Sequence, residues 1–117
     1  MHRQLRLTKD KDFSAVFSGG RVWTNQLLAV RSEENGLDHN RYGFIVSKRL
    51  GNAVARNKVR RRLRQVVASE ATSDGWDVII SARKYAAQAD FVELKKSVVK
   101  LFGRAGILAS NTEESSS

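Results

Sequence analysis

Basic side chains have the clearest chemistry in this sequence, and they are concentrated in one window. Positions 48–64 hold eight Lys and Arg residues and no acidic residue. The whole chain of 117 residues has 21 Lys and Arg and 12 Asp and Glu, a net charge of +9, so removing the window (9 − 8) leaves +1 for the rest. Because guanidinium groups bind phosphate oxygens through paired hydrogen bonds, this window predicts a polyanionic partner.

The window is predicted to lie on a long helix over about residues 53–71. Val59, Leu63 and Val66 recur at i, i+4 and i+7, with Val67 at their edge. This spacing places an apolar stripe along one side of a helix that is otherwise cationic. The stripe is therefore expected to face the core and the cations to face outward.

The polar flanks of this helix favour nucleic acid as the partner. Asn57, Arg60 and Arg64 share one flank at about 100° per residue, and Arg62 lies on the opposite flank. A solvated surface helix usually alternates its cations with acids at i+4, and positions 48–64 have none. Nucleic acid therefore explains the charge better than solvation alone, although the helix by itself does not separate RNA from DNA.

The acidic side chains form no catalytic constellation. Phosphodiester hydrolysis needs a positioned nucleophile, charge stabilisation and usually metal ions held by clustered carboxylates. Neighbouring acids fall instead in a helical turn, a loop and the tail: Asp10, Asp12, Glu33, Glu34, Asp38, Glu113 and Glu114. Cysteine is absent, and no apolar run approaches the roughly 20 residues that span a bilayer, so we expect a soluble cytoplasmic protein without disulfides.

The length predicts one domain, residues 1–108, followed by a polar and disordered tail, residues 109–117. Thr8 is expected to cap a first helix, which Gly19-Gly20 ends. The order helix, strands, helix, strand, helix indicates an α+β sandwich with helices packed on a small sheet.

The strands of that sheet are predicted from short runs of β-forming residues. Residues 22–31 and 41–47 are expected to be strands that pair as a hairpin. Residues 77–82 form a nearly continuous apolar run, which is typical of a buried strand. Apolar residues over 91–102 then recur at helical spacing and predict an amphipathic last helix.

Residues 46–64, VSKRLGNAVARNKVRRRLR, closely resemble the signature of the bacterial ribonuclease P protein family. The resemblance extends from about Leu7 to Phe102, through Lys-x-x-Asp-Phe-x-x-Val-Phe at residues 9–17 and Asp-Val-Ile-Ile-x-Ala-Arg at residues 77–83. It implies an α-β-β-β-α-β-α sandwich with a mixed sheet and a left-handed strand–helix–strand crossover around the basic helix. That fold has one strand more than the hydrophobic pattern indicates.

The resemblance also implies a function. Such a subunit binds the catalytic RNA of ribonuclease P, and a cleft between the first helix and the sheet holds the 5′ leader of precursor tRNA. The implied RNA-binding residues are Lys48, Arg49, Arg56, Asn57, Lys58, Arg60, Arg61 and Arg64. The implied residues of the leader cleft are Phe13, Phe17, Ile45 and Ser47. Catalysis would then lie in the RNA, which with the substrate would hold Mg²⁺, and one protein would bind per RNA.

Two residues depart from the family pattern, and two phenylalanines have a second interpretation. Lys58 stands where many relatives have arginine, which keeps the charge and loses the planar fork. Arg31 stands where relatives often have an aromatic residue, although arginine can also stack on a base. Phe13 and Phe17, at i and i+4, would usually be core residues; with the resemblance, core and cleft are equally favoured.

Other functions fit parts of the sequence. A ribosomal or ribosome-assembly protein would share the basic helix and need no leader cleft. A DNA-binding regulator is disfavoured, because no short turn and helix precede the basic helix as in a helix-turn-helix. A membrane-surface role is the weakest, because the apolar stripes fit a globular core better.

Overall fold

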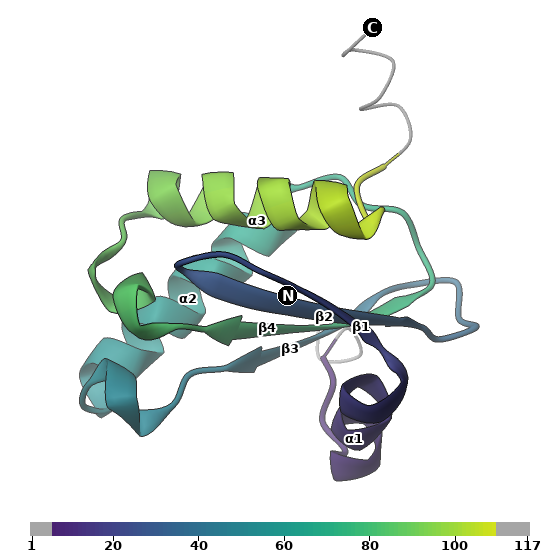
Figure 1. Ribbon diagram of the computed structural model, residues 1–117, viewed down its shortest axis with the longest axis horizontal. Coiled ribbons are helices and arrows are strands. Elements are labelled where there is room, and N and C mark those ends of the chain that lie inside the picture. Colours follow the sequence, from purple (N-terminus) through teal and green to yellow (C-terminus); the bar gives the residue numbers. More distant parts are fainter. Residues whose placement is uncertain (1–5, 110–117) are drawn as a thin grey trace, which may run out of the picture.

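The computed structural model describes residues 6–109, which form a four-stranded sheet with helices on both faces (Figure 1). The helices and strands in chain order are α1 (Asp10–Gly19), β1 (Arg21–Thr24), β2 (Leu28–Glu34), β3 (Arg41–Ile45), α2 (Ala53–Ser69), β4 (Trp76–Ala82) and α3 (Phe91–Ala105). Two short 3₁₀ helices lie among them, η2 (Lys48–Leu50) and η3 (Lys84–Gln88). The α+β prediction is confirmed, whereas the predicted tail lies, from residue 110 on, outside the described residues.

The prediction of one strand over residues 22–31 is wrong, because the chain turns at Asn25. The Oδ1 atom of Asn25 accepts hydrogen bonds from the backbone N–H groups of Leu27 and Leu28, each 2.9 Å long. This side-chain turn separates β1 from β2, and the two strands pair antiparallel. It accounts for the additional strand that the resemblance implied.

The predicted hairpin between residues 22–31 and 41–47 is also wrong, because β4 lies between β2 and β3. The sheet order is β1-β2-β4-β3, with β4 antiparallel to β2 and parallel to β3. Val78, Ile79 and Ile80 of β4 are 0% exposed, as expected for a strand covered on both faces and paired on both edges. α2 therefore forms the crossover between two parallel strands, and its left-handedness stays a prediction.

The two faces of β4 divide the core. Val78 and Ile80 point toward α2 and α3, where they join the buried stripe of α2. The predicted stripe is confirmed, since its members are all buried: Val59, Leu63, Val66 and Val67. Ile79 points the other way, toward α1, and contacts Leu7 and Val16. Helix α1 therefore has its own small cluster, separate from the main core.

Two helix starts differ from the pattern. The predicted Thr8 cap is wrong, because α1 is preceded by Lys9, whose side chain makes no capping hydrogen bond. Helix α3 begins with a capping box that the periodicity did not indicate. The Asp90 carboxylate accepts from the Glu93 N–H at 2.8 Å, and the Glu93 carboxylate accepts from the Asp90 N–H at 3.1 Å.

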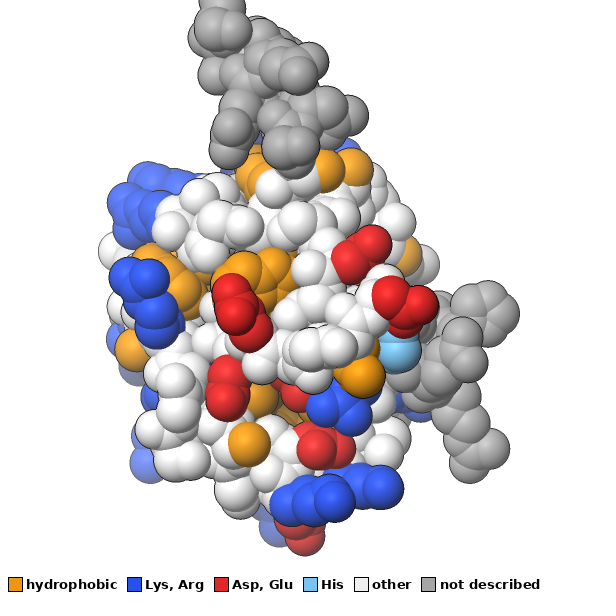
Figure 2. Space-filling view, turned by 90° about the vertical axis from the view of Figure 1, so that its right-hand side faces the viewer, with side chains coloured by type: hydrophobic (Ala, Val, Ile, Leu, Met, Phe, Trp, Pro, Cys, Tyr) orange, Lys and Arg blue, Asp and Glu red, His pale blue; other side chains and the backbone are white. Residues whose placement is uncertain are grey.

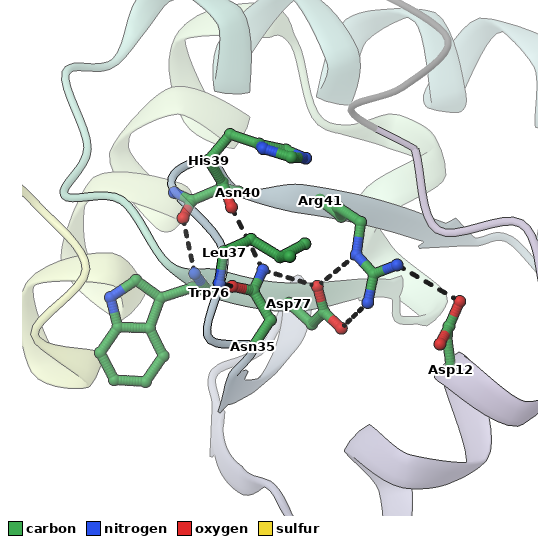
Figure 3. A network of polar contacts seen from close by, with 8 residues as sticks. All are labelled: Asp12, Asn35, Leu37, His39, Asn40, Arg41, Trp76 and Asp77. Carbon is green, nitrogen blue, oxygen red and sulfur yellow. Dashed lines mark hydrogen bonds and ion pairs between the residues drawn. The ribbon is translucent and has the colours of Figure 1, made fainter.

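A polar network ties α1 to the edge of the sheet (Figure 3). Arg41 of β3 donates from Nε and Nη2 to the two carboxylate oxygens of Asp77, at 2.8 and 2.6 Å. Asn35 donates to the same carboxylate at 2.9 Å, and Arg41 also reaches Asp12 of α1 at 3.5 Å. Because Asp77 is only 7% exposed, its charge depends on these donors.

We expect Arg41→Ala to lower the free energy of unfolding by about 3 kcal/mol, because it leaves a buried carboxylate without its cation. The measurement is equilibrium unfolding in urea. Arg21→Ala is the matched control: it removes an exposed arginine that stacks on Trp23 at 5.1 Å, and we expect it to cost less than about 1 kcal/mol. If Arg41→Ala has the same free energy of unfolding as the wild type, the network does not stabilise the sheet.

Candidate nucleic-acid interface

The basic segment, residues 48–64, occupies η2 and the first part of α2. Leu50 is buried and anchors η2, which leaves Lys48 and Arg49 exposed. The Oδ1 atom of Asn52 caps α2 by accepting from the Ala55 N–H at 2.9 Å. Local capping and one apolar anchor therefore present the cations at the start of the helix.

The structure leaves every predicted RNA-binding side chain outside the core. The exposed ones are Lys48, Arg49, Asn57, Lys58 and Arg61. Those half-buried are Arg56, Arg60 and Arg64. Arg62 has a structural contact instead, because it donates to the Ala89 carbonyl at 2.9 Å, on the flank opposite to Arg60 as predicted.

Asn57, Arg60 and Arg64 do come together on one flank. Arg60 donates to the Asn57 side-chain oxygen at 2.9 Å, and the Arg64 guanidinium lies 5.9 Å from the centre of the Phe44 ring. Burial, followed by the nearby charges of Arg6 and Arg60, lowers the pKa of Arg64 from its ordinary value. An anion placed here would relieve this repulsion.

The buried Nε atoms of Arg56 and Arg64 have no hydrogen-bond acceptor among the described residues. Buried donors are usually paired. These two N–H groups are therefore unpaired, and because each Nε atom is covered, an acceptor from outside the chain would reach it only after the side chain moves.

A groove of about 220 Å³ joins this flank to the chain that precedes α1. Its lining comes from three parts of the chain: Arg6, Leu7, Thr8, Phe13, Tyr42, Gly43, Phe44, Arg60 and Arg64. The Leu7 N–H donates to the Tyr42 carbonyl at 2.8 Å, so residues 6–8 lie against the free edge of β3. Sequence reasoning missed Arg6, because only this pairing brings it to the groove.

Phe13 contacts both the groove and the small core beneath α1. Its ring lies so close to Gly43 that a Cβ there would be 2.6 Å from the Phe13 Cζ atom. The ring also packs, together with Ile45, against the cluster that contains Ile79. Phe13 is thus half-buried and still lines the groove, which is compatible with both interpretations of this residue.

Phe17 has a different environment. Its side chain is 43% exposed, and the Arg31 guanidinium lies 4.7 Å from the centre of its ring. Arg31 belongs to β2, whereas Phe13 contacts β3, and β4 lies between these strands. Phe13 and Phe17 therefore contact different strands of the sheet.

Part of the sheet face beside α1 is lined by uncharged side chains, most of them small. The register places Thr24, Ala29, Ser81 and Ile45 in one row across the four strands, on the face opposite to α2 and α3. Thr24 is exposed and the other three are half-buried. This row is a floor that a single strand of RNA could cross beside α1.

A basic pocket of about 530 Å³ lies where β3 and β4 end. It is lined by Ser47, Arg49, Leu50, Ala82, Arg83 and Lys84. Sequence reasoning included Ser47 and Arg49 and missed Arg83 and Lys84, although they directly follow a predicted buried strand. Because β3 and β4 are parallel, residues after both strands meet at this edge.

The charge is distributed unevenly over the molecule. The basic segment lies at one end (Figure 1), and the other end, around the turn between β2 and β3, carries acidic side chains among basic ones (Figure 2).

Within residues 6–109, no cluster of three or more His, Cys, Asp or Glu could hold a metal ion. None of the helices described is long and apolar enough to cross a membrane.

Known proteins are similar to this sequence over most of its length. Residues 1–106 match the family Ribonuclease P. A "Ribonuclease P protein component" from Dehalococcoides mccartyi is 37% identical over 117 residues, which covers 100% of this chain and 98% of the relative. One from Streptococcus mutans is 40% identical over 100 residues, 85% of this chain and 84% of the relative.

Solved structures share the fold. The RNase P protein of Staphylococcus aureus matches with a TM-score of 0.80 and 30% identity, over 90% of this chain and 98% of that one. The RNase P protein of Thermotoga maritima matches with a TM-score of 0.78 and 28% identity, over 85% of this chain and 96% of that one. With the sequence matched over residues 1–106 and the fold shared, this chain belongs to the ribonuclease P protein family.

Proposed function

We propose that this chain is the RNA-binding accessory subunit of a ribonucleoprotein endoribonuclease that removes 5′ leaders from precursor tRNA. The observation that supports this most strongly is the β3-edge groove. There Arg60 and Arg64 of α2 line one groove together with Phe13 of α1, so two cationic side chains stand beside an aromatic ring. Curated relatives named as ribonuclease P protein components point to the same role.

Assembly with the catalytic RNA would use the basic segment. Its exposed cations would contact phosphates, and the half-buried arginines Arg56, Arg60 and Arg64 would supply fixed forks. Arg60 is already held by Asn57, so less side-chain entropy is lost on binding. This surface would neutralise RNA phosphates and favour the folded catalytic RNA.

The leader would cross the sheet face beside α1. The floor row of Ala29, Ser81 and Ile45 leaves room for nucleotides, and Phe13 and Phe17 stand along its α1 side. The basic pocket with Arg49, Arg83 and Lys84 continues this path at the ends of β3 and β4. Such a path would raise the affinity for a substrate that carries a leader and leave that for mature tRNA unchanged.

The chemical step is assigned to the RNA, which with the substrate would hold Mg²⁺. Two carboxylates beside α1 and the sheet, those of Asp12 and Asp77, both accept hydrogen bonds from Arg41 and serve the fold. The side chains named along the proposed RNA path are cationic, aromatic or uncharged, and none is acidic. Such side chains bind and position RNA, and one protein per RNA is the simplest stoichiometry.

The double variant Arg60→Ala, Arg64→Ala should weaken binding to the catalytic RNA by about 1–3 kcal/mol per lost charged contact. It should also flatten the plot of log affinity against log salt by roughly 0.7–0.9 for each lost phosphate contact. The measurement is a salt titration of binding. Lys96→Ala, Lys100→Ala removes the same charge from α3 and should keep the wild-type slope; an equal loss in both variants would mean that net charge alone binds RNA.

Purified protein without the RNA subunit should not cleave precursor tRNA. The test incubates the chain with precursor tRNA and magnesium and analyses the products on a sequencing gel. The control adds the catalytic RNA to the same preparation, which should then release the leader. Specific leader removal by the protein alone would overturn the assignment of the chemistry to RNA.

Phe17→Leu should leave folding and RNA assembly nearly intact, because it keeps apolar volume and Phe17 is 43% exposed. It should reduce the affinity of the holoenzyme for leader-bearing substrate by about 1–3 kcal/mol, since the aromatic face is lost. Binding of mature tRNA should not change. A lower melting temperature with no leader dependence would instead identify Phe17 as a core residue.

A further inference from the structure

Arg31 stands on the sheet face that α1 covers only in part. The register places it between Val22 of β1 and Ile79 of β4, and Ile79 contacts the α1 cluster. Its guanidinium stacks on Phe17 with 4.7 Å between the Arg31 Cζ atom and the ring centre. One face of the most exposed aromatic ring of α1 is therefore already occupied by a cation.

The donors of this guanidinium are unused. Among residues 6–109, no carboxylate or carbonyl forms an ion pair or hydrogen bond with Arg31. Glu33, the next acid on the same face of β2, has its carboxylate beside Gly19 instead. A guanidinium that stacks through its flat face keeps its five N–H groups in the plane, free for an acceptor.

The ring and the cation have complementary roles. A nucleobase could stack on the covered face of Phe17 only by displacing Arg31, which would cost the cation–π contact. A phosphate oxygen, in contrast, can approach the in-plane donors while the stack stays intact. Phe17 then acts by fixing Arg31 over the path rather than by offering that face to a base.

We propose that Arg31, held by Phe17, is a phosphate-binding site for one nucleotide of single-stranded RNA on the sheet face beside α1. The inference rests on the proposed function, which places the 5′ leader on this face. It assigns a sequence-independent contact to a residue that the pattern of relatives would assign to base stacking.

The test uses the reconstituted holoenzyme and precursor tRNAs with one altered leader position at a time. A methylphosphonate removes the charge of a single phosphate, and an abasic nucleotide removes a single base. For the wild type, we expect one methylphosphonate position to weaken binding about threefold to tenfold, with no loss from the abasic nucleotide there. In Arg31→Ala this methylphosphonate effect should disappear.

Two further variants sharpen the result. Phe17→Leu and Arg31→Ala should not be additive, because both remove the same held guanidinium. Arg21→Ala is the matched control, since Arg21 stacks on Trp23 at 5.1 Å on the opposite face of the same hairpin. It should leave the methylphosphonate pattern of the wild type unchanged.

Different failures have different meanings. An abasic effect that Arg31→Ala removes would show base recognition and overturn the proposal. Methylphosphonate effects of equal size in the wild type and in Arg31→Ala would also overturn it, while leaving the leader path in place. A wild-type holoenzyme that binds leader-bearing and leaderless substrates equally would overturn the proposed function itself.

Discussion

The burial of β4 on both faces and both edges is the constraint on which the rest of the molecule depends. Residues 78–80 have no exposed surface, so helices must cover both sides of the strand. The apolar stripe of α2 covers one side, and its basic flank is turned outward as a consequence. Val16 of α1 covers the other side at Ile79, which holds α1 over the opposite face of the sheet.

The two faces of the sheet meet at the outer edge of β3, the last strand of the sheet. Phe44 and Gly43 are neighbours in this strand and point to opposite faces, one toward Arg64 and the other toward Phe13. Because β3 is the edge strand, no further strand separates the two side chains, and one groove contains both. The surface that we propose for the catalytic RNA and the wall of the proposed leader path are therefore continuous.

The elements that could be predicted from the sequence are those with local signals. The stripe of α2 and the amphipathic α3 depend on spacing within one helix, and both were predicted correctly. The pairing of β2 with β4 joins segments more than 40 residues apart, and nothing in the run 41–47 distinguishes it from a hairpin partner. The Asn25 turn was missed because its side-chain hydrogen bonds interrupt an otherwise continuous β-forming run.

The same difference between local signals and long-range pairing applies to the residues of the candidate site. The apolar spacing placed most of the basic segment correctly on the long helix α2, because this signal is local, whereas η2 was not predicted. Arg6 joins the groove, and Arg83 and Lys84 join the basic pocket, only through strand pairing, which their positions in the sequence do not indicate. The Arg31 stack on Phe17 likewise requires β2 to lie under α1, a contact that sequence spacing does not encode.

The arginines of this chain divide according to what their neighbours leave unsatisfied. Arg41 and Arg62 donate to a carboxylate and to a backbone carbonyl, which satisfies N–H groups and ties elements together. Arg31 and Arg64 instead contact the rings of Phe17 and Phe44, and a ring orients a guanidinium without using its in-plane donors. The donors of Arg41 and Arg62 are thus used within the fold, whereas the ring contacts of Arg31 and Arg64 orient these two side chains for the phosphate contacts that we propose.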